Sequence, residues 1–235
     1  MSKYIRTIPL EVVRASYRPV AFTLQEHLAS LVQEEPLLRP PSLVGGLDVS
    51  YYGPRARAAI VVMTYHTQEI VAHATYETTT FAPYTPGLLA WRELPLMLAV
   101  VEQLGFLPDV LLCDAQGRAH PRRLGLASHL GVILNHPTIG CAKTRLVGTF
   151  ADLPESQGAV APLLDRGEVI GAVVRTRAHV RPVYVSVGHR ITLDEAVDIV
   201  VHLAHYRVPE PLRMADALSR TGQIPQTRFY PLSSP

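Results

Sequence analysis

Three carboxylates lie inside segments of the chain that are otherwise apolar, where a folded protein tolerates charge poorly. Asp48 interrupts the apolar run 43–49, Asp114 follows the apolar stretch 110–113, and Glu93 lies in the apolar stripe of a predicted helix. Removing an ionised carboxylate from water is unfavourable unless the group is paired, protonated or bound to a metal ion. A divalent cation best explains three such groups, so the fold has to bring these segments together.

The composition argues against several classes of protein. Of the 235 residues, 48% are hydrophobic and 18% are charged, which is typical of a globular chain rather than a disordered one. Apolar runs such as 60–63 are too short to span a bilayer, and the first residues lack the apolar core of a signal peptide. The two cysteines, Cys113 and Cys141, lie in apolar or motif-like stretches. We therefore expect reduced, structural thiols and a cytoplasmic protein without a membrane partner.

The net charge of +2 is small, but its distribution is uneven. Residues 1–114 contain eight Lys and Arg against eleven Asp and Glu, and residues 115–235 contain fourteen against nine. A basic half that faces an acidic metal pocket would suit a polyanionic substrate, with ordinary scatter as the alternative. The only lysines are Lys3 and Lys143. An internal lysine in a chain so poor in lysine is a candidate functional residue.

The order of the predicted elements points to an α/β fold. An amphipathic helix over 10–35 and a linker near 34–41 precede three strand-like stretches at 43–51, 58–66 and 69–77. The short connection near Thr67 and Gln68 predicts a hairpin, and so an antiparallel meander. A helix over 87–104 and a buried strand that ends at Asp114 follow. This is the order of a ribonuclease H-like fold, a mixed sheet of an antiparallel three-strand meander and parallel strands flanked by helices.

The remaining elements are shorter. The pattern predicts a helix over 126–135, a strand over 137–142, a strand pair near 168–175 and 182–187, and partial helix over 211–220. A further helix begins at Thr192, whose spacing to Glu195 is typical of a capping box. His202 and His205 on this helix have a spacing that could bind metal, but a polar helix face is the preferred interpretation. His189, which follows Gly188 in a turn, is interpreted as structural.

Glu93 falls on the inward face of its helix. At about 100° per residue, Leu89, Leu96, Met97, Val100 and Leu104 all lie within roughly 60° of it. Pro95 removes one backbone hydrogen bond and predicts a local kink near Glu93. The alternative for Glu93 alone is a buried side chain that bonds a backbone donor or pairs with Arg92.

Asp48 and Asp114 come from different strands, and ligands gather beyond the carboxyl ends of parallel strands. Carboxylates with water suit Mg²⁺ or Mn²⁺, and the sequence has no Cys/His spacing of a zinc site. Such a site hydrolyses a phosphodiester in line, because the metal activates water and neutralises the phosphate. A turn role for Asp114, which precedes Ala115-Gln116-Gly117, is the alternative.

Four ordered stretches resemble the endonuclease V family, which nicks nucleic acid beside deaminated purines, chiefly inosine. They are Gly46-Leu47-Asp48-Val49-Ser50-Tyr51, Pro83-Tyr84-Thr85-Pro86-Gly87-Leu88-Leu89 with Arg92-Glu93, Asp114-Ala115-Gln116-Gly117-Arg118-Ala119-His120-Pro121-Arg122, and Pro137-Thr138-Ile139-Gly140-Cys141-Ala142-Lys143. The match is close over about 43–150 and looser at 185–189 and 209–211. The resemblance implies one domain over 1–235, with an N-terminal helix and linker (1–41), a catalytic core (42–208) and a C-terminal tail (209–235).

The resemblance also assigns the site residues. The family's metal-binding carboxylates fall on Asp48, Glu93 and Asp114, and its catalytic lysine falls on Lys143, for which a surface role is the alternative. The loop that contains Tyr84 and Pro86 resembles the family's wedge, which fills the space left by an extruded base. The backbone of Gly87 and Leu89 would then read the base, with His120 close to the pocket. Arg118, Arg122 and Arg123 would hold backbone phosphates or form a solvated basic loop.

Three positions depart from the family pattern. Thr85 stands where the wedge usually has Ile, and Ala115 stands where glycine is usual. Asp216 stands where the family often has a further metal-site histidine. Because aspartate also binds Mg²⁺, we expect Asp216 to join the metal site, with an altered metal preference or rate.

The resemblance implies a monomeric, Mg²⁺-dependent repair endonuclease, with Mn²⁺ able to substitute. It would act on DNA that contains deoxyinosine, cut the second phosphodiester bond 3′ to the lesion and leave 3′-hydroxyl and 5′-phosphate ends. Inosine-containing RNA is a second possible substrate, because eukaryotic relatives favour it. The alternatives are another ribonuclease H-like repair nuclease or resolvase, and a protein that binds altered bases without cutting.

Overall fold

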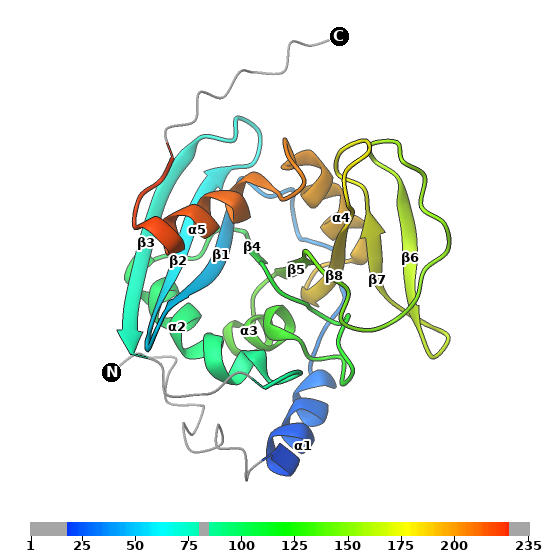
Figure 1. Cartoon of the computed structure of the whole chain (residues 1–235), viewed down its shortest axis with the longest axis horizontal. Helices are drawn as coiled ribbons and strands as arrows, with labels where there is room; N and C mark the ends of the chain where they lie inside the picture. The colour runs from blue at the N-terminus through cyan, green and yellow to red at the C-terminus, as the bar shows by residue number, and fades with distance from the viewer. Residues whose placement is uncertain (1–17, 80–84, 226–235) are drawn as a thin grey trace.

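Eight strands join one mixed sheet in the order β3-β2-β1-β4-β5-β8-β7-β6 in the computed structural model, which describes residues 18–79 and 85–225 (Figure 1). The strands are β1 (Leu43–Tyr52), β2 (Arg55–Thr64), β3 (Ile70–Thr79), β4 (Val110–Cys113), β5 (Thr138–Ala142), β6 (Val160–Asp165), β7 (Glu168–Val174) and β8 (Val183–His189). The helices are α1 (Arg18–Ala29), α2 (Leu89–Leu104), α3 (Leu126–Leu134), α4 (Leu193–His202) and α5 (Glu210–Thr221).

The strand pairings confirm the predicted mixed sheet. Strands β1, β2 and β3 form the antiparallel meander, and β4 is parallel to both β1 and β5. Strands β8, β7 and β6 continue the sheet in antiparallel pairs. The two parallel pairings are central, so both faces of β4 are covered and all four of its residues are buried.

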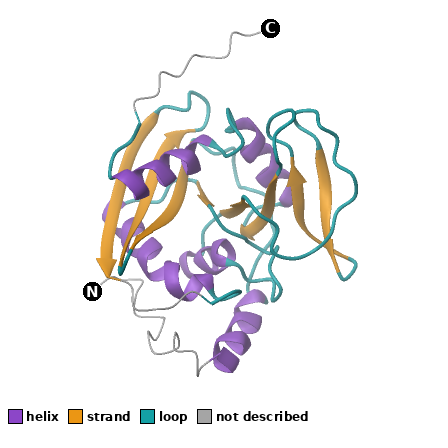
Figure 2. Ribbon diagram, viewed as in Figure 1, coloured by secondary structure: helices purple, strands orange, loops and turns teal. Residues whose placement is uncertain are grey.

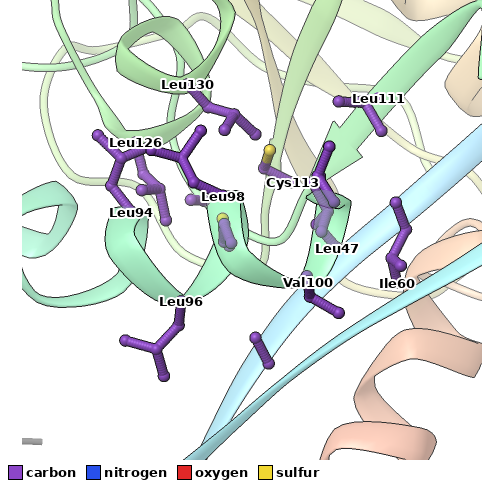
Figure 3. Packing of buried hydrophobic residues seen from close by; sticks show 14 of the residues in the cluster. Leu47, Ile60, Leu94, Leu96, Leu98, Val100, Leu111, Cys113, Leu126 and Leu130 are labelled. Carbon is purple, nitrogen blue, oxygen red and sulfur yellow. The ribbon is translucent and has the colours of Figure 1, made fainter. Parts of the chain in front are cut away.

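Helices cover both faces of the sheet (Figure 2). Alternate residues of β2 point to opposite faces of the sheet. Ile60 and Val62 pack with α2 on one face. On the other face, Ala59, Val61 and Met63 pack with three residues of α5, Met214, Ala215 and Leu218. This is the period of two that a strand buried on both faces requires. Figure 3 shows the α2 side of the core, where Leu94 and Leu98 meet Leu126 and Leu130 of α3 and Cys113 of β4.

The last helix, α5, packs closely on β1. A Cβ atom at Gly46 would lie 2.2 Å from the backbone of Pro211, so only glycine allows this approach. The Tyr52 hydroxyl shares its one hydrogen between the carbonyl of Arg220, at 2.7 Å, and the carbonyl of Ser219. A hydroxyl from β1 therefore bonds two of the unpaired carbonyls at the end of α5, and the helix is fixed on the strand at both ends.

Three expectations differ from the structure. The helix predicted over 10–35 ends at Ala29. Residues 30–32 instead form a turn, in which each backbone amide donates to the carbonyl three residues earlier. Residues 10–17 lie outside the part of the chain that the structure describes. Strand β6 was not predicted. It lies at the edge of the sheet with alternate residues exposed and contains Pro162, which only an edge strand accommodates readily.

The prediction that His202 and His205 share one helix is wrong, because α4 ends at His202 and His205 lies beyond it. Other predictions are confirmed. Thr192 and Glu195 form the capping box at the start of α4, and Pro95 lies inside α2. Cys113 and Cys141 are free and buried. Within the part of the chain that the structure describes, no helix is long and apolar enough to cross a membrane.

Candidate active site

Asp48 and Asp114 lie side by side where the parallel pairing of β1 and β4 ends. The last parallel pair of β1 and β4 joins Leu47 to Cys113, and the backbone amide of Asp114 donates to the carbonyl of Leu47 at 3.2 Å. Both aspartates directly follow that pair: Asp48 continues β1, and Asp114 is the first residue after β4. The register therefore brings together the two carboxylates singled out in the sequence.

A serine of α5 holds Asp48. The hydroxyl of Ser219 donates to Oδ2 of Asp48 at 2.7 Å, and its own oxygen lies 2.7 Å from the hydroxyl of Ser50. Because Ser219 is fully buried, the contact is shielded from water. Burial raises the pKa of Asp48, the bond from Ser219 lowers it, and the nearby charges of Asp114 and Asp216 raise it further. Lys143 lowers it, but the net shift is upward, so the site disfavours the ionised form of Asp48, which a bound cation would favour.

Glu93 enters the site from α2, which packs on the face of the sheet opposite α5. Its side chain accepts a hydrogen bond from the Tyr51 hydroxyl at 3.0 Å and is 8% exposed. Burial raises the pKa of Glu93 to about 8, the bond from Tyr51 works against this rise, and the charge of Asp48 adds to it. The guanidinium of Arg92 lies 3.9 Å from the centre of the Tyr51 ring. Arg92 thus supports the tyrosine that holds Glu93, rather than pairing with Glu93 as the alternative supposed.

Lys143 follows β5 and forms an ion pair with Asp114. Burial lowers the pKa of Lys143, but the charges of Asp114, Asp216 and Asp48 outweigh burial and raise it. Asp216, on α5, pairs with Arg220 at 2.9 Å and is near enough to act on both Asp48 and Lys143. The structure therefore brings Asp216 and Lys143 to the three predicted carboxylates.

The donor set fits a hard divalent cation. Asp48, Glu93 and Asp114 offer carboxylate oxygens, and the electrostatic repulsion among them would be relieved by a cation. One oxygen of each carboxylate takes a protein donor, which leaves the second oxygen of the group as a potential ligand. Among residues 18–79 and 85–225, no three Asp, Glu, His or Cys side chains form a ready ligand group. A cation would therefore have to draw these carboxylates closer together.

A cavity of about 420 Å³ lies beside the carboxylates. Asp114 and Lys143 line it together with the predicted base-binding residues Gly87, Leu89 and His120. The cavity therefore joins the candidate metal site to the candidate base site.

His120 is buried and neutral at pH 7. Burial and, to a smaller extent, the charge of Arg122 lower its pKa to about 4, against the bond to Gly87, which raises it. Nδ1 of His120 accepts from the Arg122 amide at 3.2 Å, so Nε2 carries the hydrogen and donates to the Gly87 carbonyl at 3.2 Å. His120 thus supports the cavity wall as a neutral donor.

The other predicted residues divide into three groups. Tyr84 lies outside the described residues, while Pro86 is exposed at the loop just before the cavity. Arg122 contacts the cavity wall by donating a hydrogen bond from Nη2 to the carbonyl of Gly87 at 2.8 Å. Arg118 bonds Glu34 and Glu168, and Arg123 bonds Asp165 and Glu168, so acidic side chains already hold both guanidinium groups.

Sequence reasoning missed Ser219 as a contact of Asp48 and Gln25 as a contact of Gly87. Neither residue lies in a motif. Tyr51 did lie in the first motif, but its contact with Glu93 depends on how α2 crosses β1. These contacts join residues far apart in sequence, for which the sequence carries no local signal.

A family model for endonuclease V matches residues 26–217 of the chain. The chain belongs to the endonuclease V family. Endonuclease V of Roseiflexus sp. (strain RS-1) is 45% identical over 207 residues, which cover 88% of this chain and 93% of that protein.

Solved endonuclease V structures share the fold. The enzyme from Streptomyces avermitilis superposes with a TM-score of 0.82 at 42% identity, covering 87% of this chain and 92% of that one. A variant of Ciona intestinalis endonuclease V, in complex with a 23-mer DNA containing an inosine followed by a ribo-adenosine, superposes with a TM-score of 0.80 at 29% identity and covers 89% and 98% of the two chains. The predicted ribonuclease H-like fold of an endonuclease V is therefore confirmed.

Proposed function

We propose that this protein is a divalent-cation-dependent endodeoxyribonuclease that recognises deoxyinosine. It would hydrolyse the second phosphodiester bond 3′ to the lesion and leave 3′-hydroxyl and 5′-phosphate ends. The observation that carries the proposal is the pair Asp48 and Asp114 side by side where the parallel pairing of β1 and β4 ends, with Glu93 and Lys143 beside them and a cavity of about 420 Å³ next to Asp114 and Lys143. Membership of the endonuclease V family and the inosine-containing DNA bound by the Ciona protein support it.

Asp48, Glu93 and Asp114 would hold Mg²⁺ or Mn²⁺, with Asp216 adding negative charge or a fourth ligand. When bound, the cation would activate water and neutralise the scissile phosphate. Lys143 has a second task, because its ammonium is a compact point charge that can turn from Asp114 to a phosphate oxygen. Ser219 and Tyr51 orient two of the carboxylates before the cation arrives.

The cavity would take the extruded base. Gly87, Leu89 and the neutral His120 line it, and no cationic side chain is needed to read a neutral base there. Tyr84 and Pro86 would form the wedge that fills the gap in the duplex. Arg122 would lie toward the phosphates of the bound strand, whereas Arg118 is already held by Glu34 and Glu168.

Inosine-containing RNA is the second candidate substrate. The DNA in the Ciona complex carries a ribo-adenosine directly after the inosine, so that relative accommodates a ribose at this position. A comparison of matched DNA and RNA strands would rank the two substrates for this chain.

The decisive experiment is a nicking assay with end-labelled duplexes that carry one deoxyinosine or none, with Mg²⁺ or with EDTA. We expect one Mg²⁺-dependent nick at the second bond 3′ to the lesion. Asp48→Ala and Asp114→Ala should abolish the nick and still bind the lesion in a gel-shift assay. A shifted band without any nick from the wild type would make the protein an altered-base binder and overturn the proposal.

A further inference from the structure

One backbone carbonyl at the cavity wall receives three side-chain donors. The carbonyl of Gly87 accepts from Gln25 Nε2 at 3.1 Å, from Arg122 Nη2 at 2.8 Å and from His120 Nε2 at 3.2 Å. A carbonyl oxygen has two lone pairs, so this group is fully engaged. Such a concentration of donors on one peptide indicates that its orientation matters.

The peptide between Gly87 and Leu88 is fixed on both sides. Its carbonyl is held by the three donors, and its amide, the N–H of Leu88, donates to the carbonyl of Thr85 at 2.9 Å. Gly87 has a φ of +76°, and a Cβ there would lie 2.9 Å from Nη2 of Arg122. The left-handed backbone favours glycine, and the peptide cannot turn over without breaking four hydrogen bonds.

Gln25 is the member of this cluster that comes from the far N-terminal side of the sequence. It lies on α1, is 1% exposed, and uses both ends of its amide. Nε2 also donates to the carbonyl of Leu124 at 3.3 Å, and Oε1 accepts from Nε of Arg122 at 2.7 Å. One side chain therefore ties the cavity wall at Gly87 to the segment that follows β4.

Helix α1 supports Arg122 by a second contact. The ring of Phe22, one turn before Gln25, lies 3.9 Å from the guanidinium carbon of Arg122. The guanidinium is thus held between a ring face and an amide oxygen, both from α1, and directs Nη2 at Gly87. This arrangement is more than the satisfaction of one buried glutamine, because it sets the direction of two other groups at the cavity.

We propose that Gln25 is a positioning residue for lesion recognition. By holding the Gly87 carbonyl and Arg122, it keeps the backbone of Gly87 and Leu89 in the shape that receives the extruded base. The inference rests on the proposed function. It predicts that Gln25 affects the affinity for the lesion and leaves the chemical step at the carboxylates unchanged.

The test compares Gln25→Met and Gln25→Glu with the wild type. Methionine keeps the volume of glutamine and removes every hydrogen bond, whereas glutamate keeps the acceptor for Arg122 and removes the donor to Gly87. For both variants we expect KM for the deoxyinosine duplex to rise about tenfold, with kcat within about twofold of wild type, since the glutamate variant loses two hydrogen bonds of Gln25 and the methionine variant loses three. The Kd for an uncleaved duplex in Ca²⁺ should rise in parallel, with no change for undamaged DNA.

Gln68→Met is the matched control. Gln68 is also buried, and its Nε2 donates to the carbonyl of His202 at 3.2 Å in the β2–β3 connection, which lies at the opposite end of the sheet from α1 (Figure 1). It should lower the melting temperature as the Gln25 variants do and leave KM unchanged. Thermal melts of all variants would identify any loss of folded protein, which lowers the maximal rate without changing KM.

The outcomes separate the two proposals. A wild type that neither nicks nor binds the deoxyinosine duplex would refute the proposed function. The role of Gln25 would be overturned if the wild type is active and the Gln25 variants have a normal KM. It would also be overturned if these variants show only a lower maximal rate, as Gln68→Met does. If Gln25→Glu alone behaved as wild type, the contact with Arg122 and not the contact with Gly87 would matter, which would also overturn the inference as stated.

Discussion

Each carboxylate at the candidate metal site is held by one donor from a different part of the chain. Ser219 donates to Asp48, Tyr51 donates to Glu93, and Lys143 pairs with Asp114. Donors of this kind set the orientation of a ligand before the metal binds and strengthen its binding. At the residue scale, the metal affinity should therefore depend on groups that never touch the metal.

Ser219→Ala tests this dependence. The change removes the hydrogen bond to Asp48 and leaves Ser50 without its partner, so we expect the Mg²⁺ or Mn²⁺ affinity to fall roughly tenfold. Calorimetric titration of Mn²⁺ would measure it, and the nicking rate should recover at high Mg²⁺. Ser30→Ala, which removes an exposed hydroxyl that bonds only its local helix end, is the control. An unchanged Mn²⁺ affinity in Ser219→Ala would show that the serine is merely packed against the aspartate.

His129 makes the free energy of unfolding depend on pH in the acid range. It is 1% exposed against Trp91, and burial lowers its pKa to about 4. Above pH 6.5 the group is neutral in both the folded and unfolded chains and has no effect. Between pH 6.5 and 4, His129 takes up the proton in the unfolded chain but not in the folded chain. The free energy of unfolding therefore decreases as the pH is lowered through this range.

His129→Leu should remove this part of the acid sensitivity. Between pH 7 and pH 4.5, we expect the wild type to lose roughly 2 kcal/mol more free energy of unfolding than the variant. Urea denaturation at the two pH values would measure the difference. Equal losses in both proteins would contradict the assignment.

At the element scale, α5 decides whether the site is complete. It lies on β1 beside Gly46 and brings Ser219 and Asp216 to the carboxylates of β1 and β4. Its helical character was predictable from the apolar spacing over 211–220. Its place on the sheet was not, because an amphipathic face does not specify which strand it covers.

Gly46→Ala tests the docking of α5. The new methyl group would lie 2.2 Å from the backbone of Pro211, so the helix must move. We expect a loss of about 3 kcal/mol in the free energy of unfolding and weaker cation binding. Gly53→Ala is the control, since its methyl group meets open space and only the left-handed backbone at φ +56° is strained, by about 1 kcal/mol. A loss no larger than that of the control would show that α5 tolerates displacement.

Other elements show the same limit of sequence reasoning. The meander β1–β3 was predictable because its strands are long and its turns short. Strand β6 was not, since it has few buried residues and contains Pro162. The three carboxylates were recognisable because charge in an apolar segment is unfavourable, whereas Gln25 and Ser219 are polar residues on ordinary amphipathic helices. Their contacts arise only from the packing of elements distant in sequence.

For the whole molecule, the carboxylate cluster is a source of instability that a cation would relieve. Burial and mutual repulsion raise the pKa of both Asp48 and Glu93, so their ionised forms oppose folding. A cation that binds the folded chain alone stabilises it by mass action.

Saturating Mg²⁺ should therefore raise the melting temperature. At one hundred times its Kd, the ion adds about 2.7 kcal/mol, which for a chain of this size is roughly 5 to 10 °C. EDTA should reverse the shift, and Asp48→Asn should reduce it to a small fraction. A thermal melt that ignores Mg²⁺ would argue against a cation site on this cluster.

The position of α5 also has a consequence for biosynthesis. The chain emerges from the ribosome with β1 and β4 first, and the serine that orients Asp48 comes from residues 210–221, long after both strands are made. Until residues 210–221 are made, the carboxylates of β1, α2 and β4 lack Ser219 and Asp216. The candidate metal site is thus completed last, so a polypeptide whose synthesis stops short of residue 210 carries Asp48, Glu93 and Asp114 without Ser219 and Asp216.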